Sequence, residues 1–427
     1  MDLELVTIGT ELLLGFTLDT NSAFLGQALA DAGVRIARRT SVHDEPDAVR
    51  DAVREALSRS RLVITTGGLG PTRDDLSKNV VAELFQLPLE FHQDIWDDLA
   101  ARWARMGRKI GERNRCQAEV PRGALILPNR WGTAPGLWIT GALGEVVMLP
   151  GVPAEMRGLV THEVVPRLAA RSGGRVVRSL VLRTTGMPES SVAERLAPAE
   201  STLPPLTLAY LPSLEGVDLR LTAWKLEPLE ADAALSKAAA RLSDALGDHV
   251  YGRGDADLAA VLLEECRSKG HTIAVAESCT GGMLGARITA IPGSSDVFRG
   301  GVVPYANHVK LRLGVPPRIL DTDGAVSEEA VRAMATTVRE EFGATIGAAV
   351  SGIAGPGGGS EAKPVGTVWF AFADDSGVES RKYVFPGSRH DVRARASQFA
   401  LWGLLRRAKS AGAKGPAVAR LQDPLSP

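Results

Sequence analysis

The sequence has few cysteines and no long apolar run. Its 427 residues include three cysteines, Cys116, Cys266 and Cys279, which lie far apart and form no CxxC pair. This spacing argues against a zinc cluster or a disulfide framework and fits a reducing compartment. No apolar run approaches the ~18 residues of a membrane span. The opening residues 1–6 carry acids where a signal peptide needs bases, so we expect a cytoplasmic protein with no membrane partner.

An excess of charge of one sign is also lacking. Lys and Arg total 49 and Asp and Glu total 50, which leaves a formal net charge of −1. A dedicated nucleic-acid binder would show a basic excess, so we expect small molecules and no nucleic acid as partners. At this length we expect two or three domains. The base rate among soluble oligomers predicts a homodimer.

Strand-like and helical segments alternate from the start of the chain to about residue 170. Residues 3–8, 34–40 and 61–66 have the composition of strands, and helical patterns at 22–32 and 46–58 separate them. Such alternation predicts an α/β domain with a mainly parallel sheet. RSGGR at 171–175 and GRGDAD at 252–257 read as hinges around a small α+β unit, after which α/β alternation returns. We expect the small and polar residues 409–427 to be disordered.

A glycine-rich turn with acids follows the third predicted strand, in TTGGLGPTRDDLSK at 65–78. Glycines allow left-handed conformations, and exposed N–H groups at such a turn suit an anion. Asp74 and Asp75 can hold a divalent cation that bridges phosphate oxygens, and Lys78, one helical turn later, can face the same ligand. The alternative is that Asp74 and Asp75 only cap a helix, and this stretch alone leaves both interpretations open.

Two further loops are candidates for the same site. GTELLLGFTLDTN at 9–21 follows the first strand and carries Glu11, Asp19 and Asn21, while PNRWGTAPG at 128–136 precedes a strand at 137–140. Loops that follow parallel strands gather at the carboxyl edge of the sheet, where ligands bind. We therefore expect Asp19 and Asn21 to bind ligand and Glu11 to be a further candidate metal ligand.

These stretches, together with NRCQA and LPGVPAEM, resemble the N-terminal domain of the competence/damage-inducible protein CinA family, which is related to the molybdopterin-binding fold. The resemblance implies metal-dependent hydrolysis of ADP-ribose to AMP and ribose 5-phosphate. It implies that Gly67, Gly68 and Gly70 form a phosphate-binding turn. It also implies that Asp74 and Asp75 are metal ligands or catalytic acids. Two positions depart from the pattern: Leu69 replaces the Thr or Ser usual in molybdopterin binders, and Cys116 replaces a frequent Lys, so we infer that Cys116 is not catalytic.

The middle unit, residues 171–252, resembles the small KH-like module of the same family. A KH domain that binds nucleic acid needs a GxxG loop to clamp the backbone. No GxxG occurs between residues 175 and 251, and no basic run replaces it. A spacer or dimerisation element is therefore the favoured interpretation.

VAESCTGG at 275–282 offers three candidate nucleophiles, Ser278, Cys279 and Thr280, at a predicted strand-to-helix turn. A serine hydroxyl needs a base, and no histidine motif supplies one. In GGVVPYANHVKLRLG at 300–314 we expect a strand at 301–305 and a helix with Asn307 as its N-cap. Lys310 would then lie in the first turn.

In that position the helix dipole and partial burial would both lower the pKa of Lys310. A neutral Lys310 can accept the Ser278 proton, as in Ser–Lys hydrolases, while Tyr305 relays a proton or orients the substrate. The alternative is that Lys310 is an ordinary solvated helix residue.

Two more stretches suit a phosphate. VSGIAGPGGGSEAKPVGTVW at 350–369 follows a strand at 346–350 and supplies free backbone N–H groups for a phosphate or oxyanion. In FPGSRHDVRARAS at 385–397, Arg389 and Arg393 are four residues apart on a predicted helix, a spacing that suits phosphate. The alternative is a solvated basic face. The candidate glycines of the loop are Gly352, Gly355, Gly357 and Gly358.

The stretches AESCTGG, GSSDVFRGGVVPYANHVK, GAVSEEAVRAMA, SGIAGPGGGSEAKPVGTV and GSR resemble the C-terminal CinA domain over about residues 257–407. That domain corresponds to nicotinamide mononucleotide (NMN) amidohydrolases. The resemblance implies Ser278 as nucleophile, Lys310 as base and Tyr305 as its partner, with no cofactor. The glycine loop and Arg389 would hold the 5′-phosphate. The backbone N–H groups of the turn residues Thr280, Gly281 and Gly282 would hold the oxyanion. Ser388 replaces the acid that usually precedes the arginine.

The expected architecture is a molybdopterin-binding-like three-layer α/β domain at 1–170, a KH-like α+β module at 171–252 and a C-terminal α/β deamidase domain at 253–408. The expected function is that of a bifunctional pyridine-nucleotide hydrolase acting on NMN and, with a divalent metal ion, on ADP-ribose. The alternative is a non-catalytic molybdopterin- or nucleotide-binding scaffold linked to competence or recombination. The lack of a basic patch and of a GxxG loop disfavours the scaffold.

Overall fold

The computed structural model describes residues 1–72 and 75–410, and its contacts divide the chain into two compact units. One unit contains Met1–Ser179 and Thr222–Leu235, and the other contains Leu180–Leu221 and the described residues from Ser236 onward. Asp74 and nearly all of the expected tail lie outside the described residues. Lys409 and Ser410 are an exception, because they end a helix rather than begin a disordered segment. The division into three domains by residue number stays a prediction.

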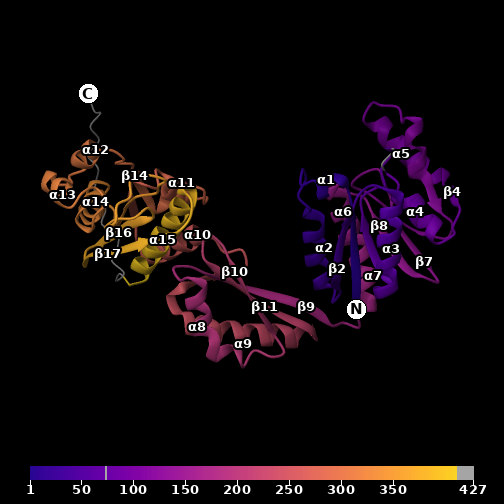
Figure 1. Cartoon of the computed structure of the whole chain (residues 1–427), viewed down its shortest axis with the longest axis horizontal. Helices are drawn as coiled ribbons and strands as arrows, with labels where there is room; N and C mark the ends of the chain where they lie inside the picture. Colours follow the sequence, from indigo (N-terminus) through magenta and orange to yellow (C-terminus); the bar gives the residue numbers. More distant parts are fainter. Residues whose placement is uncertain (73–74, 411–427) are drawn as a thin grey trace. The chain divides into compact units, whose positions relative to one another are not determined.

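The N-terminal unit contains a six-stranded sheet whose first four strands are parallel (Figure 1). The last two strands are antiparallel to their neighbours, so the expected parallel sheet carries an antiparallel edge. In spatial order its strands are β2 (Arg35–Val42), β1 (Asp2–Ile8), β3 (Leu62–Thr66), β8 (Gly144–Leu149), β7 (Gly136–Gly141) and β6 (Leu125–Leu127).

Helices cover both faces of this sheet. Leu5 and Val6 of β1 are adjacent, and they pack in two different hydrophobic clusters because successive side chains of a strand point to opposite faces. Leu25 of α2 packs in the first cluster and Val53 of α3 in the second, which gives three layers. The helices are α1 (Thr10–Leu13), α2 (Thr20–Asp31), α3 (Pro46–Ser60), α4 (Ser77–Leu84), α5 (Gln93–Arg105), η1 (Glu112–Ala118), α6 (Pro153–Leu159), η2 (Val160–Val164) and α7 (Val165–Arg171). Two short strands, β4 (Leu89–Phe91) and β5 (Glu119–Pro121), form a separate antiparallel pair.

The middle residues form a four-stranded sheet with two longer helices. Its strand order is β10-β11-β9-β12, and β12 is antiparallel to β9. The elements are β9 (Val176–Thr184), α8 (Glu189–Glu200), β10 (Thr207–Pro212), β11 (Val217–Leu226), α9 (Pro228–Leu246), η3 (Gly247–His249) and β12 (Val250–Arg253).

The C-terminal residues form a five-stranded sheet in which β13 lies between two parallel neighbours. Val275 of β13 packs in a cluster with α10 and α15, and Ala274 packs in a cluster with α14, so helices again cover both faces. In spatial order the strands are β14 (Phe298–Val302), β13 (Ile273–Glu277), β15 (Ile346–Gly352), β16 (Thr367–Asp374) and β17 (Gly377–Val384). The helices are α10 (Leu258–Lys269), α11 (Met283–Thr289), η4 (Ser294–Asp296), α12 (Asn307–Arg312), α13 (Pro317–Thr322), α14 (Glu328–Glu341) and α15 (Arg389–Ser410).

Side chains and glycines set the ends of several of these helices. Asp257 accepts a hydrogen bond from the Ala259 N–H at 2.7 Å and so begins α10, and Gly270 ends it in the left-handed conformation. The strand expected at 301–305 lies three residues earlier in the structure, where β14 runs from Phe298 to Val302. It ends before Pro304, which has no N–H to donate.

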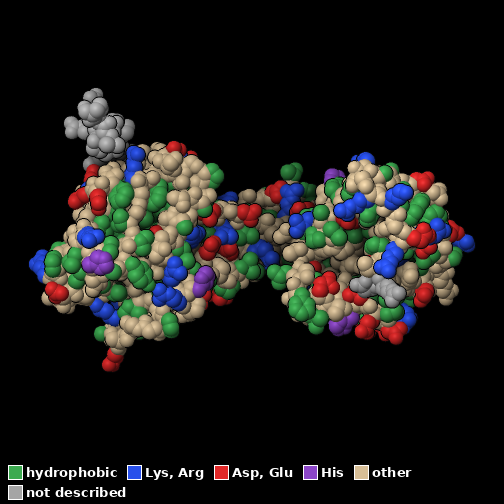
Figure 2. All heavy atoms as spheres, turned by 90° about the horizontal axis from the view of Figure 1, so that it is seen from above, with side chains coloured by type: hydrophobic (Ala, Val, Ile, Leu, Met, Phe, Trp, Pro, Cys, Tyr) green, Lys and Arg blue, Asp and Glu red, His purple; other side chains and the backbone are tan. Residues whose placement is uncertain are grey.

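The surface mixes charges of both signs. Figure 2 shows Lys and Arg side chains interspersed with Asp and Glu over the visible face of the described residues. Among those residues, none of the helices is long and apolar enough to cross a membrane.

Candidate active sites

Three loops meet at one edge of the C-terminal sheet because they follow parallel strands. Ser278 follows β13 directly, and its N–H donates to the Val350 carbonyl of β15 at 2.8 Å. Lys310 lies on α12, which follows β14, and the glycine loop follows β15. The sequence motifs that lie up to eighty residues apart are thus brought to the same place.

Lys310 is buried, with 1% of its surface exposed, and it reaches Ser278. Its Nζ lies 3.1 Å from Ser278 Oγ, 2.7 Å from the Pro304 carbonyl and 3.0 Å from the Tyr305 carbonyl. A neutral amine has two hydrogens and one lone pair. The two carbonyls can accept both hydrogens, which leaves the lone pair facing the Ser278 hydroxyl.

Burial is the main reason that the pKa of Lys310 lies below its ordinary value of 10.5. Burial is one of the two causes expected for Lys310, and the other, the positive end of the helix dipole, is wrong. Ala306, not Asn307, is the N-cap of α12, and no side chain caps that helix. Asn307 is exposed at the first helical position, and Lys310 lies in the last turn of a six-residue helix, away from the positive end of the dipole.

The contacts separate the three candidate nucleophiles. Burial raises the pKa of the Cys279 thiol to about 12, so it stays protonated at neutral pH and is a poor nucleophile. Thr280 is fully buried, and its Oγ1 has no hydrogen-bond partner among the described residues. Ser278, in contrast, has the amine of Lys310 as a neighbour.

Glu277 organises the turn, and sequence reasoning missed it. Its buried carboxylate accepts hydrogen bonds from the N–H groups of Gly282 at 3.0 Å, Leu284 at 3.0 Å and Gly285 at 2.8 Å. The Gly281 N–H bonds to the Ser278 carbonyl at 3.2 Å. The N–H groups of Gly281 and Gly282 are therefore already engaged, which contradicts their expected role as oxyanion donors. The third expected donor, the Thr280 N–H, lies beside the Cys279 thiol. The sequence signal for this role of Glu277 was its position directly before Ser278, in a turn that ends in two glycines.

Arg389 joins the glycine loop to Tyr305. It donates to the Gly355 carbonyl at 2.8 Å and to the Tyr305 hydroxyl at 2.8 Å. The Tyr305 hydroxyl therefore faces Arg389, and the main-chain carbonyl of Tyr305, not its hydroxyl, contacts Lys310. A proton relay through that hydroxyl is not what the geometry provides. Of the loop glycines, Gly357 and Gly358 are exposed beside the buried Gly355, and Gly352 is half-buried at the end of β15.

Arg393 serves the turn rather than a second phosphate contact. Its Nη2 donates to the Thr280 carbonyl at 2.7 Å. The two arginines of the 385–397 motif therefore bind different parts of the site, and the sequence spacing alone could not distinguish these roles.

A cavity of about 370 Å³ lies beside the glycine turn of the N-terminal unit. The turn residues Gly67, Gly68 and Gly70, and also Asp75 and Glu11, line it as expected. Gly67 and Gly68 have φ of 108° and 70°, a region that other residues rarely adopt. The Gly67 N–H donates to the Leu149 carbonyl at 3.0 Å, so it is not free to bind a phosphate.

The same cavity is lined by residues that sequence reasoning did not single out. Gln117 is buried, and its Oε1 has no hydrogen-bond partner among the described residues. Asp44 and Glu155 also lie on the wall, as does Thr133 from the loop that precedes β7. Gln117 lies within the NRCQA motif, next to Cys116, the residue of that motif considered in the sequence analysis.

Three expected ligand-binding residues do not line this cavity. Asp19 caps α2, since it accepts a hydrogen bond from the Ser22 N–H at 2.9 Å. Asn21 donates to the Gly151 carbonyl at 2.7 Å and to the hydroxyl of Thr66, the last residue of β3, at 3.3 Å. Lys78 is buried and donates to the Cys116 carbonyl, so it does not face a ligand. Burial lowers its pKa.

The described residues do not by themselves form the expected metal site. The cavity carboxylates are oxygen donors of the kind that Mg²⁺ prefers. Yet no group of three or more Asp, Glu, His or Cys side chains in the described ranges could hold an ion. Asp75 Oδ2 already accepts hydrogen bonds from Thr72 at 2.8 and 2.6 Å. The partner expected for it, Asp74, lies outside the described residues.

Comparisons with known proteins cover the chain almost completely. Family models match residues 4–170 (probable molybdopterin binding domain), 179–252 (damage-inducible protein CinA KH domain) and 255–408 (CinA C-terminal domain). A CinA-like protein of Gemmatimonas aurantiaca is 50% identical over 98% of this chain and 99% of its own. One of Synechococcus sp. strain RCC307 is 46% identical over 89% and 92%.

A solved structure of competence damage-inducible protein A from Klebsiella pneumoniae is 35% identical and covers 36% of this chain and 96% of its own, with a TM-score of 0.35. The family models confirm the expected mixed α/β architecture with its molybdopterin-binding-like, KH-like and CinA C-terminal parts. With half of its residues identical to a CinA-like protein along nearly the whole length of both, this chain belongs to the CinA family.

Proposed function

We propose that the C-terminal domain hydrolyses the carboxamide of NMN to nicotinic acid mononucleotide and ammonia. The observation that carries the proposal is the buried Lys310, whose Nζ lies 3.1 Å from Ser278 Oγ. A serine beside a buried amine is the arrangement of Ser–Lys hydrolases. The substrate is supported by the resemblance of this domain to NMN amidohydrolases.

The reaction proceeds through an acyl-enzyme. Lys310 takes the Ser278 proton while Oγ attacks the carboxamide carbon, and the proton then passes to the leaving nitrogen as ammonia departs. Lys310, neutral again, takes a proton from water, whose oxygen attacks the ester carbon. The ester bond to Ser278 breaks, and Oγ recovers its proton from Lys310. The product leaves as the carboxylic acid, which gives its proton to solvent and becomes the carboxylate. The Pro304 and Tyr305 carbonyls hold the Lys310 amine in place in both protonation states, because they accept hydrogens from either form.

Binding of the 5′-phosphate is assigned to Arg389 and the glycine loop. Two of the five N–H bonds of Arg389 are used on Gly355 and Tyr305, which fix the guanidinium at the site. The remaining N–H groups can donate to a phosphate together with the backbone of the exposed residues 357–359.

Two alanine variants test the nucleophile. Ser278→Ala should abolish release of ammonia from NMN and leave cleavage of ADP-ribose unchanged. Cys279→Ala, the matched control one residue away, should retain deamidation. Ammonia release by Ser278→Ala at the wild-type rate, or its loss in Cys279→Ala alone, would show that the serine is wrongly assigned.

For the N-terminal domain we propose hydrolysis of the pyrophosphate bond of ADP-ribose, with a divalent metal ion, to AMP and ribose 5-phosphate. The supporting observation is the 370 Å³ cavity at the glycine turn, walled by carboxylates and by the unpartnered Gln117 Oε1. Cavities of this size hold small ligands. An amide oxygen without a partner is suited to accept a hydrogen bond from a ribose hydroxyl or from water.

The double variant Asp74→Ala, Asp75→Ala should lose ADP-ribose cleavage and keep NMN deamidation. The matched control is Asp47→Ala, Asp51→Ala, a pair of exposed acids on α3 whose side chains are 82% and 62% accessible. Each protein is incubated with ADP-ribose and Mg²⁺, Mn²⁺ or Co²⁺. Metal-responsive cleavage by the Asp74/Asp75 variant would overturn the assignment, and products from neither substrate in the wild type would favour a binding scaffold.

A further inference from the structure

The unit that holds Ser278 contains a cavity of its own, distinct from the one at the N-terminal glycine turn, and the proposed reactions do not use it. Its volume is about 370 Å³, within the range of small-molecule pockets. Three chain segments and one helix line it: the turn at 185–188, the hairpin turn at 214–216, residues 383–386 and the α15 residues Arg395, Gln398 and Phe399. Ser278, Lys310 and Arg389 are not among its lining residues.

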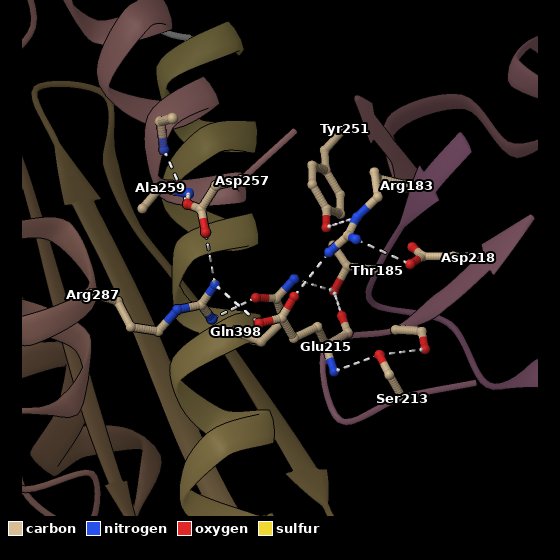
Figure 3. A network of polar contacts seen from close by, with 12 residues as sticks. Arg183, Thr185, Ser213, Glu215, Asp218, Tyr251, Asp257, Ala259, Arg287 and Gln398 are labelled. Carbon is tan, nitrogen blue, oxygen red and sulfur yellow. Dashed lines mark hydrogen bonds and ion pairs between the residues drawn. The ribbon is translucent and has the colours of Figure 1, made fainter. Parts of the chain in front are cut away.

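Most polar groups on its wall already have partners within a network that Figure 3 shows. Gln398 accepts from Arg287 at 2.6 Å and donates to Thr185 Oγ1 at 3.3 Å, so both ends of its amide are used. Glu215 accepts from Arg183 at 3.0 Å. These contacts make a fixed polar rim, and they leave a ligand little to bind there.

Arg395 is the exception. Its Nε is buried and has no hydrogen-bond partner among the described residues. The nearest acid along the helix, Asp391, accepts instead from the Ser388 N–H at 2.8 Å. A guanidinium is always charged, and a buried N–H without a partner is costly, so an anion in this cavity gains a strong contact.

Aromatic rings supply the apolar wall. Tyr383, Phe385 and Phe399 all line the cavity. Tyr383 and Phe385 are stacked with ring centroids 5.8 Å apart, and Phe399 lies 4.2 Å from Tyr383. Rings packed in this way favour a flat aromatic ligand.

We propose that this cavity binds a planar aromatic carboxylate, with the ring against Tyr383, Phe385 and Phe399 and the carboxylate on Arg395. The inference is independent of the deamidase proposal, since it concerns other residues and is tested by binding alone.

The probe is 2-naphthoate, titrated into the full-length protein by calorimetry. We expect binding that weakens at least about tenfold in Arg395→Gln, since a charge-assisted hydrogen bond is lost. Arg389→Gln is the matched control, six residues away on α15, and it should bind the probe as the wild type does. The neutral 2-naphthamide should bind about tenfold more weakly than 2-naphthoate.

A cavity-filling substitution tests the same site without changing its charge. Leu214→Trp places a large side chain in the cavity from a partly exposed turn, so the fold should tolerate it, and it should block 2-naphthoate. Circular dichroism checks that each variant is folded. Absence of binding to the wild type, equal binding of acid and amide, or loss of binding in Arg389→Gln with retention in Arg395→Gln would overturn the proposal.

Discussion

Lys78 in the N-terminal unit and Lys310 in the C-terminal unit are both buried, with 9% and 1% of their surfaces exposed. Burial lowers the pKa of each below 10.5. Each donates to main-chain carbonyls, Lys78 to Cys116 and Lys310 to Pro304 and Tyr305. The difference is one further contact, because Lys310 also reaches the hydroxyl of Ser278.

The comparison shows that a lowered lysine pKa does not by itself identify a catalytic base. Both lysines satisfy that criterion, and structural burial alone produces it. What distinguishes Lys310 is a group whose proton it can take. The first predictions therefore act on Lys310 and its surroundings, and the last acts on Lys78.

The largest effect is expected for Lys310→Met. Without the amine, Ser278 keeps its proton, and kcat for NMN deamidation should fall by about three orders of magnitude or more. Ammonia release measures this. Because Met removes an amine that is costly to bury, the free energy of unfolding should stay equal or rise. A loss of activity below tenfold would contradict the role of Lys310 as base.

The pH dependence of the same pair has a definite sign. A lowered pKa means that the folded protein binds fewer protons at Lys310 than the unfolded protein between that pKa and 10.5. The free energy of unfolding of the wild type should therefore rise with pH through this window relative to Lys310→Met. Deamidation should rise in the same direction as Lys310 loses its proton. Urea unfolding and rates at several pH values test both, and a pH-independent stability difference would contradict the burial effect.

The next effect is expected for Arg389→Gln. Loss of a charged phosphate contact should lower kcat/KM for NMN by about 10- to 100-fold. For nicotinamide riboside, which has no phosphate, kcat/KM should change by less than about threefold. Arg393→Gln is the control, because it contacts the Thr280 carbonyl and should affect both substrates alike. Equal losses on both substrates in Arg389→Gln would remove Arg389 from phosphate binding.

Much of this site was predictable because strand order decides where loops gather. Ser278, Lys310 and the glycine loop each follow a strand, and the three strands are parallel neighbours. The side-chain directions were not predictable in the same way. Asp19 has the sequence context of a ligand residue, yet it caps α2, and only the fold shows that Asn21 bonds to the end of β3.

A smaller effect is expected for Glu277→Gln. The amide keeps one acceptor oxygen but loses the charge that holds three N–H groups, so the turn loosens. We expect about a tenfold loss of kcat and a loss of about 1–2 kcal/mol in the free energy of unfolding. Glu264→Gln, whose side chain is 76% accessible on α10, is the control for losing one carboxylate. An unchanged kcat would show that the turn does not need this charge.

The smallest effect is expected for Lys78→Met, and it is the sharpest test of the comparison. Lys78 contacts a main-chain carbonyl and not the cavity, so ADP-ribose cleavage should change by less than about twofold. Removal of a buried amine should leave stability equal or higher. If cleavage instead fell as far as deamidation does in Lys310→Met, Lys78 would act on the ligand after all. Burial and a lowered pKa would then mark catalytic lysines in both units, and the contact with Ser278 would no longer be what separates them.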